Sequence, residues 1–122
     1  MRIFLGLSVL VWLPYGVFCF LNPGFLAGAA GVAYSSPTGA TELRAMYGGL
    51  QIAIGLLAGA ALVRTELART ALTTLLFLTA GLGTTRLLGL LLDGGLSAYT
   101  VGALGFEMVC ATVAFFLLRD AD

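Results

Sequence analysis

Histidine and lysine are both missing from this sequence of 122 residues, and charged residues make up only 10% of it. The absence of histidine removes the most frequent metal ligand, haem ligand and proton shuttle of proteins. Six arginines balance six acidic residues, so the chain has no net charge that would attract nucleic acid. The sequence therefore predicts no metal, no cofactor and no nucleic-acid partner.

Cysteine is scarce as well, and the two present do not form a recognisable pair. Cys19 and Cys110 stand alone within apolar runs, with no C-x-x-C spacing and no second metal ligand beside either. An isolated cysteine in such a run behaves as a small apolar residue. We interpret both as packing residues and identify no catalytic residue.

Apolar residues are what the sequence has in abundance. They make up 60% of the chain, and the mean hydropathy is +1.05. A water-soluble domain of this size would have to expose large apolar patches. Four apolar stretches of about 20 residues stand out, each long enough at ~1.5 Å per residue to cross the ~30 Å hydrocarbon core. They are residues 3–21, 42–63, 70–92 and 99–118. We predict an all-α membrane protein, a single domain built as a bundle of four transmembrane helices.

The connections between these stretches are unequal. Residues 22–41 form a long segment rich in glycine, alanine, serine and proline, and long loops are often functional. Asn22-Pro23 favours a short helix on the membrane surface that continues through Tyr34 and ends at Ser35-Ser36-Pro37. The first stretch also resembles a secretion signal, with alanine-rich residues 27–30 as a cleavage-like site. Because Pro14 interrupts the run, we interpret it as a retained first helix.

The arginines near the helix ends predict an orientation. With four spans, Arg2, Arg64, Arg69 and Arg119 all fall on one side of the membrane, and Asp93 falls on the other. Loops rich in arginine face the cytoplasm. We predict a multi-pass protein of the bacterial inner membrane with both termini cytoplasmic.

Polar residues inside the apolar stretches are the most informative feature. They are Arg44, Gln51, Arg86 and Glu107, with Glu42 and Asp93 at the margins. At ~1.5 Å per residue, Arg86 lies roughly 9 Å below the outer end of its helix, and Gln51 and Glu107 roughly 13 Å below theirs. Three helices thus place polar groups at similar depth in the outer half of the membrane.

These polar residues also share helix faces with small residues. In the second stretch one face carries Arg44, Gly48, Gln51, Gly55 and Gly59. In the last stretch Glu107 shares a face with Ala103, Cys110, Ala111 and Ala114. Small residues favour close helix packing in membranes. We therefore predict that the polar faces point inward, and that the glycines at 48, 49, 55, 59, 81, 83 and 89 serve packing.

An unpaired ion inside the membrane costs ~2.5–3.5 kcal/mol or more, so these charges should pair. We predict that Arg86 contacts Glu107, and that Gln51 and Tyr47 supply further hydrogen bonds. Arg44 is expected to pair with Glu42 or Asp93 nearer the surface. Such a cluster is consistent with polar contacts that fix helix register, or with the floor of a binding pocket.

The motifs resemble a known family. The run Glu42-Leu-Arg44-Ala-Met-Tyr47-Gly48-Gly49-Leu-Gln51, then Arg86-Leu-Leu-Gly89, Asp93-Gly94 and Glu107, resembles bacterial membrane proteins grouped as domain of unknown function 4345. That family is in turn similar to the wider group of DoxX-like four-helix membrane proteins. The resemblance implies a four-helix architecture without an established activity. It also implies a set of signature positions: Glu42, Arg44, Tyr47, Gly48, Gly49, Arg86, Asp93 and Glu107.

Three classes of function remain open from the sequence. The first is a non-enzymatic module that binds a small amphiphile or a membrane partner through the outer-half cluster. Apolar outer surfaces such as Phe115 and Phe116 suit lipid and a homo-oligomer equally. The second is a small proton-coupled transporter that uses Glu107. The third is an enzyme acting on a lipid or quinone, with Glu107 or Asp93 as acid/base and Arg44 or Arg86 holding an anionic group. We favour the non-enzymatic module.

Overall fold

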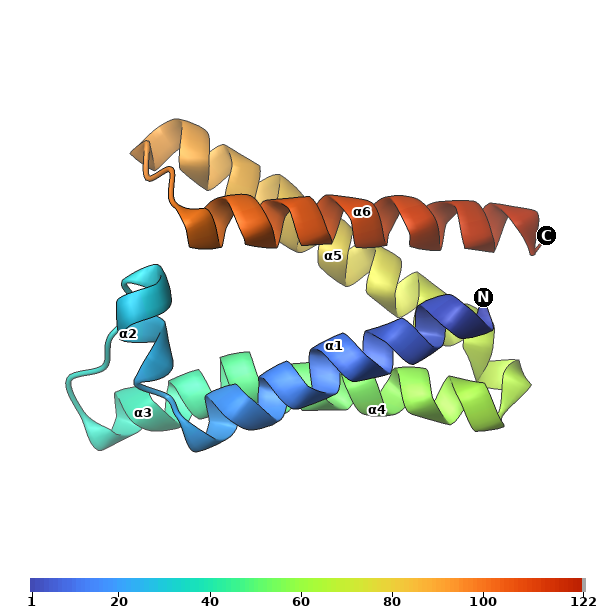
Figure 1. Ribbon diagram of the computed structural model, residues 1–122, viewed down its shortest axis with the longest axis horizontal. Coiled ribbons are helices and arrows are strands. Elements are labelled where there is room, and N and C mark those ends of the chain that lie inside the picture. Colours follow the sequence, from blue (N-terminus) through green and yellow to red (C-terminus); the bar gives the residue numbers. More distant parts are fainter. Residues whose placement is uncertain (122) are drawn as a thin grey trace. The chain divides into compact units, whose positions relative to one another are not determined.

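The computed structural model describes residues 1–121, and every regular element in this part of the chain is a helix (Figure 1). Four helical segments are long and apolar enough to cross a membrane, with mean hydropathies between 1.7 and 2.1. They are Arg2–Leu21, Pro37–Val63, Thr65–Asp93 and Ala98–Asp120. The predicted fold class is therefore confirmed, and the chain is a multi-pass membrane protein.

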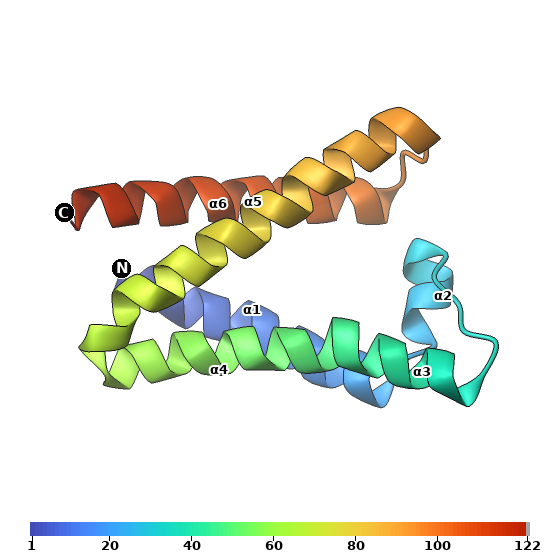
Figure 2. The same ribbon diagram turned by 180° about the vertical axis from the view of Figure 1, so that it is seen from behind.

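The chain divides into two compact units, Met1–Leu67 and Ala68–Asp122, and each is described by itself. The first unit contains helices α1 (Arg2–Leu21), α2 (Phe25–Ala30), α3 (Pro37–Leu43) and α4 (Leu50–Val63), with a π-helix, η1 (Arg44–Gly49), between α3 and α4 and a 3₁₀ turn, η2 (Thr65–Leu67), after α4. Helix α1 packs along η1 and α4, as Figures 1 and 2 both show.

Glycines bring α1 and the second spanning segment into close contact. A Cβ built on Gly16 would lie 2.8 Å from both the carbonyl oxygen of Gly48 and the amide nitrogen of Ile52. A Cβ on Gly55 would lie 2.8 Å from the Cβ of Leu13. Real side chains do not approach this closely, so only glycine permits this separation of the helix axes.

The connection between the first two spans differs in detail from the prediction. Helix α2 ends at Ala30 rather than at Tyr34, because Gly31 adopts a left-handed conformation (φ 71°) that ends the helix. Ser36-Pro37 begins the next helix instead of ending this one. The Ser36 hydroxyl accepts a hydrogen bond from the Gly39 amide at 3.1 Å, and proline suits the first helical turn.

The orientation of α2 within the first unit fits an interfacial helix. Figure 1 shows α2 running across the direction of α1. Because α1 is long enough to cross the bilayer, a helix running across it has the direction expected of the predicted surface helix, whose place on the membrane stays a prediction. The second span in turn starts five residues earlier than the predicted residue 42 and includes α3.

The π-helix η1 is a feature that periodicity did not reveal. It spans Arg44–Gly49, and the amide of Leu50 donates to the carbonyl of Ala45, five residues back. Single π-turns within α-helices are rare and occur frequently at functional sites. Here the π-turn coincides with the Arg-Ala-Met-Tyr-Gly-Gly motif.

The second unit is a pair of long helices, α5 (Ala68–Asp93) and α6 (Ala98–Asp120), packed along their length. Ser97 caps α6, its hydroxyl accepting from the amide of Thr100 at 3.2 Å. Buried positions recur every three or four residues on α5, from Ala68 through Leu72, Leu75 and Thr79 to Gly83. On α6 the buried residues are Glu107, Cys110 and Ala114. The buried face of this pair therefore includes one carboxylate among small and apolar residues.

Candidate functional site: an intramembrane arginine–glutamate pair

The site is built by one residue from each helix of the second unit. Arg86 on α5 donates from Nε to Oε1 of Glu107 at 2.7 Å, and from Nη2 to Oε2 at 3.0 Å. The guanidinium thus faces the carboxylate in the two-bond arrangement that gives arginine its strongest pairs. The predicted contact between Arg86 and Glu107 is present.

A glycine one turn away on α5 lies at the contact with α6 beside this pair. A Cβ on Gly83 would lie 2.6 Å from Cε of Met108 and 3.4 Å from Cβ of Glu107. The close atom is the flexible end of Met108, and the distance to the Cβ of Glu107 is an ordinary van der Waals contact. Gly83 therefore lies within the α5–α6 contact that carries the pair.

The two partners differ in exposure. The Glu107 side chain is 5% exposed, whereas the Arg86 side chain is 28% exposed. Two opposite charges in contact carry no net charge, which reduces the large penalty that either ion alone would meet in hydrocarbon. A polar group approaching this pair from outside therefore meets the guanidinium before it meets the carboxylate.

Comparison with known proteins places this arrangement in a family. The family model described as domain of unknown function (DUF4345) matches residues 1–118. The chain belongs to the DUF4345 family. No curated protein and no solved structure matches it. The match spans both helical units and so includes Arg86, Glu107 and the residues of η1.

A second arginine of this DUF4345 protein has a different environment from the one predicted. Arg44 donates from Nη1 to the carbonyl oxygen of Phe20, and its guanidinium lies 5.5 Å from the centroid of the Phe20 ring. The prediction of an ion pair with Glu42 is wrong, because the nearby helix end offers an acceptor on the face that Arg44 occupies. Asp93 belongs to the other unit, and a pairing with it stays a prediction.

An arginine at the opposite end of α1 makes the matching contact, which sequence reasoning missed. Arg2 donates from Nη1 to the carbonyl of Leu62 in the last turn of α4, at 3.1 Å. The last carbonyls of a helix lack partners within it and carry partial negative charge. Arg2 therefore caps the C-terminal end of α4, and Arg44 caps the C-terminal end of α1. The signal available in the sequence was an arginine near the start of each of the first two apolar stretches, Arg2 and Arg44.

The remaining polar candidates make no hydrogen bond or ion pair with Glu107 among the described residues. Gln51 lies in the first unit beside Gly16, its Oε1 is buried, and that atom has no hydrogen-bond partner among the described residues. Its predicted bond to the pair stays a prediction, as does that of the half-buried Tyr47. Glu42 and Asp93 are exposed.

The glycines predicted to serve packing fall into two groups. Gly48, Gly55 and Gly83 lie at close contacts, and Gly59 has an ordinary contact with Val9 at 3.7 Å. For three others an added Cβ would meet no neighbour closer than 3.9 Å, and their role in packing stays a prediction. These are Gly49, Gly81 and Gly89. Their spacing matched a packing face, but no neighbouring helix of their own unit covers them.

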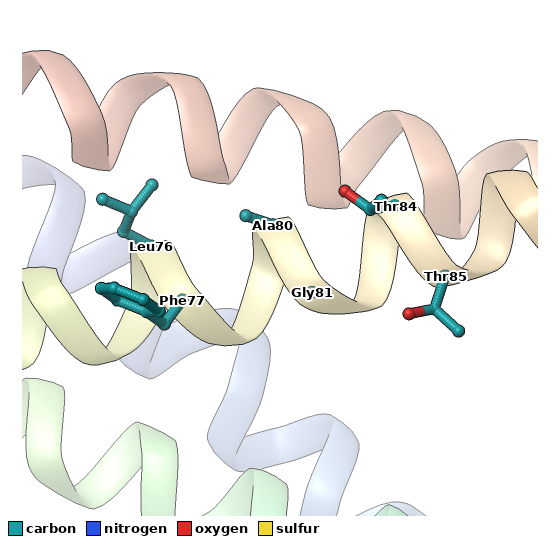
Figure 3. A pocket seen from close by; sticks show the side chains of 6 residues that line it. All are labelled: Leu76, Phe77, Ala80, Gly81, Thr84 and Thr85. Atoms are coloured by element: carbon teal, nitrogen blue, oxygen red, sulfur yellow. The ribbon is translucent and has the colours of Figure 1, made fainter.

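A concavity of this DUF4345 protein lies on α5 (Figure 3). It has a volume of about 420 Å³ and is lined by Leu76, Phe77, Ala80, Gly81, Thr84 and Thr85. At about 100° per residue these positions face largely away from Gly83 and Arg86, which contact α6. The concavity is therefore separate from the ion pair.

The chemistry of the site is that of a guanidinium and a carboxylate joined by two hydrogen bonds. Both oxygens of Glu107 accept hydrogen bonds from Arg86. No group of three or more histidine, cysteine or acidic side chains that would hold a metal ion occurs in residues 1–121. The pair can fix the register of α5 against α6, and the partly exposed guanidinium of Arg86 can donate to a polar group.

Proposed function

We propose that this DUF4345 protein is a non-enzymatic membrane module that binds a small amphiphile, or a membrane partner, through the Arg86–Glu107 pair. The observation that carries the proposal is the pair itself, which keeps two ions in a hairpin that is otherwise apolar. Polar and ionisable residues within membrane spans usually mark functional positions because they are expensive to keep there. The exposed side of Arg86 supplies the donor for a headgroup.

The proposal includes a location. The distribution of arginines supports a bacterial inner membrane protein with both termini in the cytoplasm and the ion pair in the outer half of the membrane. The kinship with DoxX-like four-helix proteins belongs to the same proposal. Gln51 and Tyr47 are its further candidate contacts.

The geometry gives less support to the alternatives. A proton carrier needs a carboxylate oxygen that a proton can reach, and both oxygens of Glu107 are engaged and only 5% of the side chain is exposed. A lipid-modifying enzyme needs a second catalytic group within reach of Glu107. Proton-coupled flux in proteoliposomes that is lost in Glu107→Gln would favour the transporter over the module.

Bound amphiphile in the purified protein tests the proposal. We expect native mass spectrometry of the full chain, followed by lipid analysis, to detect one retained amphiphile per protein. Glu107→Gln should weaken its retention about tenfold or more, because the charge that orients Arg86 is lost. Asp93→Asn removes an exposed carboxylate from α5, the helix of Arg86, and should leave retention unchanged. Wild-type protein that carries neither an amphiphile nor a stoichiometric partner would refute the module.

A further inference from the structure

Arg44 differs from Arg86 in that its charge has no acidic partner within its own helical unit. Within residues 1–121 its contacts are the carbonyl oxygen and the ring of Phe20. Glu42 is two residues away, is exposed and forms no ion pair with it. The carbonyl of Phe20 accepts a hydrogen bond from Nη1 of Arg44. No carboxylate of the first unit accepts from the other N–H groups of this guanidinium. Arg44 is thus a half-buried cation with unused donors.

Two features hold this guanidinium in place. A Cβ on Gly48 would lie 2.8 Å from the Cβ of Phe20, so η1 approaches the last turn of α1 directly below Arg44. The Phe20 ring then supports one face of the guanidinium, as in cation–π contacts. Because the side chain is already fixed, a ligand would meet an oriented group rather than a mobile one.

The level of Arg44 is that of a membrane boundary. Phe20 belongs to the last turn of α1, which ends at Leu21. The chain around it contains no charged side chain from residue 22 to residue 41, and Phe25 and Tyr34 in that segment are 39% and 45% exposed. Uncharged segments with exposed aromatic rings suit the interfacial layer of a bilayer. Arg44 is therefore a cation set in apolar, interfacial surroundings.

We infer that Arg44, held on the last turn of α1, binds the phosphate of a membrane phospholipid. The planar guanidinium presents paired N–H donors that match phosphate oxygens, and the phosphate supplies the negative charge that the first unit does not place there. A lipid source fits the site better than free phosphate, because the acyl chains would lie beside the apolar faces of α1 and the second span. The inference does not depend on the proposed function, since its residues belong to the other helical unit.

Phospholipid titration of the full chain in detergent, followed by native mass spectrometry, tests this site. We expect phosphatidylglycerol to bind wild-type protein, and Arg44→Gln to weaken its binding about tenfold or more. Arg119→Gln is the matched control. Arg119 also stacks on a phenylalanine, at 4.7 Å from the ring of Phe116, but it pairs with Asp120 at 3.5 Å. The Arg119→Gln variant should bind phosphatidylglycerol with the affinity of the wild-type protein.

Two further probes separate the sources of phosphate and the roles of Arg44. Diacylglycerol with the same acyl chains lacks phosphate and should bind wild-type protein at least about tenfold more weakly. Sodium phosphate should not displace the phospholipid; full displacement would mean a site for free phosphate and would overturn the lipid assignment. Equal affinities for Arg44→Gln and Arg119→Gln, or for the two lipids, would also overturn it. If Arg44→Gln does not fold, Arg44→Lys serves instead, and an unchanged affinity there would contradict the role of the planar donors.

Discussion

Glu107→Ala is expected to lower the free energy of unfolding of the α5–α6 pair by about 3–5 kcal/mol. The loss arises because Arg86 keeps its charge at any accessible pH and would remain in the membrane without its carboxylate. Equilibrium unfolding of the purified protein in mixed micelles measures it. The Arg86 side chain is 28% exposed, so partial movement toward water should hold the loss near the lower value.

Asp93→Ala is the control for this experiment. Asp93 is exposed at the C-terminal end of α5 and has no ion pair among the described residues. Its removal should change the free energy of unfolding by no more than about 0.5 kcal/mol, as at most surface positions. Equal losses for Glu107→Ala and Asp93→Ala would mean that the contact with Arg86 contributes little.

Gly16→Ala should be the most damaging single-methyl change in the α1–α4 pair, with a loss of about 3 kcal/mol. The new Cβ would lie 2.8 Å from the backbone of both Gly48 and Ile52, and backbone atoms cannot move aside as a side chain can. The helices would have to separate, which would also weaken the contact of Arg44 with Phe20. Unfolding in mixed micelles measures the loss.

Two other glycines show whether the cause is steric. Gly83→Ala meets a nominally closer atom, at 2.6 Å, but that atom is the flexible end of Met108, so its loss should stay below about 1 kcal/mol. Gly6→Ala, on α1, meets nothing within 4 Å and should be neutral or slightly stabilising. A ranking in which Gly83→Ala exceeds Gly16→Ala would contradict the packing described for α1.

The sequence was sufficient for the four spans because hydrocarbon imposes a strong length and composition rule on each helix. It was less informative at the ends. The start at Pro37 depends on the Ser36 cap, and the end of α2 depends on the left-handed Gly31, both local features that hydropathy does not register. The π-helix was missed for the same reason, since a single extra residue in a turn leaves the apolar pattern intact.

The site was predictable where two charges had no alternative partner. Arg86 and Glu107 lie at similar depth within apolar helices, so electrostatics alone favoured their contact. The contact of Arg44 with Phe20 was not predicted because only carboxylates were considered as partners, whereas the end of α1 offered a backbone carbonyl. The sequence does not show which helix ends lie side by side. It therefore cannot predict which helix-end carbonyl will accept a hydrogen bond from a given arginine.

The signature motif around η1 can now be partly explained in physical terms. Gly48 permits the close approach of η1 to Phe20, and Arg44 uses that approach to reach the carbonyl. Gly49 has no close neighbour, and nothing in the structure explains it. The motif thus encodes one helix-end contact, and this contact presents a cation at the membrane boundary.

A double-mutant cycle between Arg86 and Glu107, with each residue replaced by alanine singly and together, tests most directly whether the two side chains act as one unit. The account predicts that the double variant is more stable than the sum of the two single losses implies, with a coupling free energy of at least about 1 kcal/mol. Strictly additive losses would show that the guanidinium and the carboxylate do not interact in the membrane, and would contradict the site on which the proposed function rests.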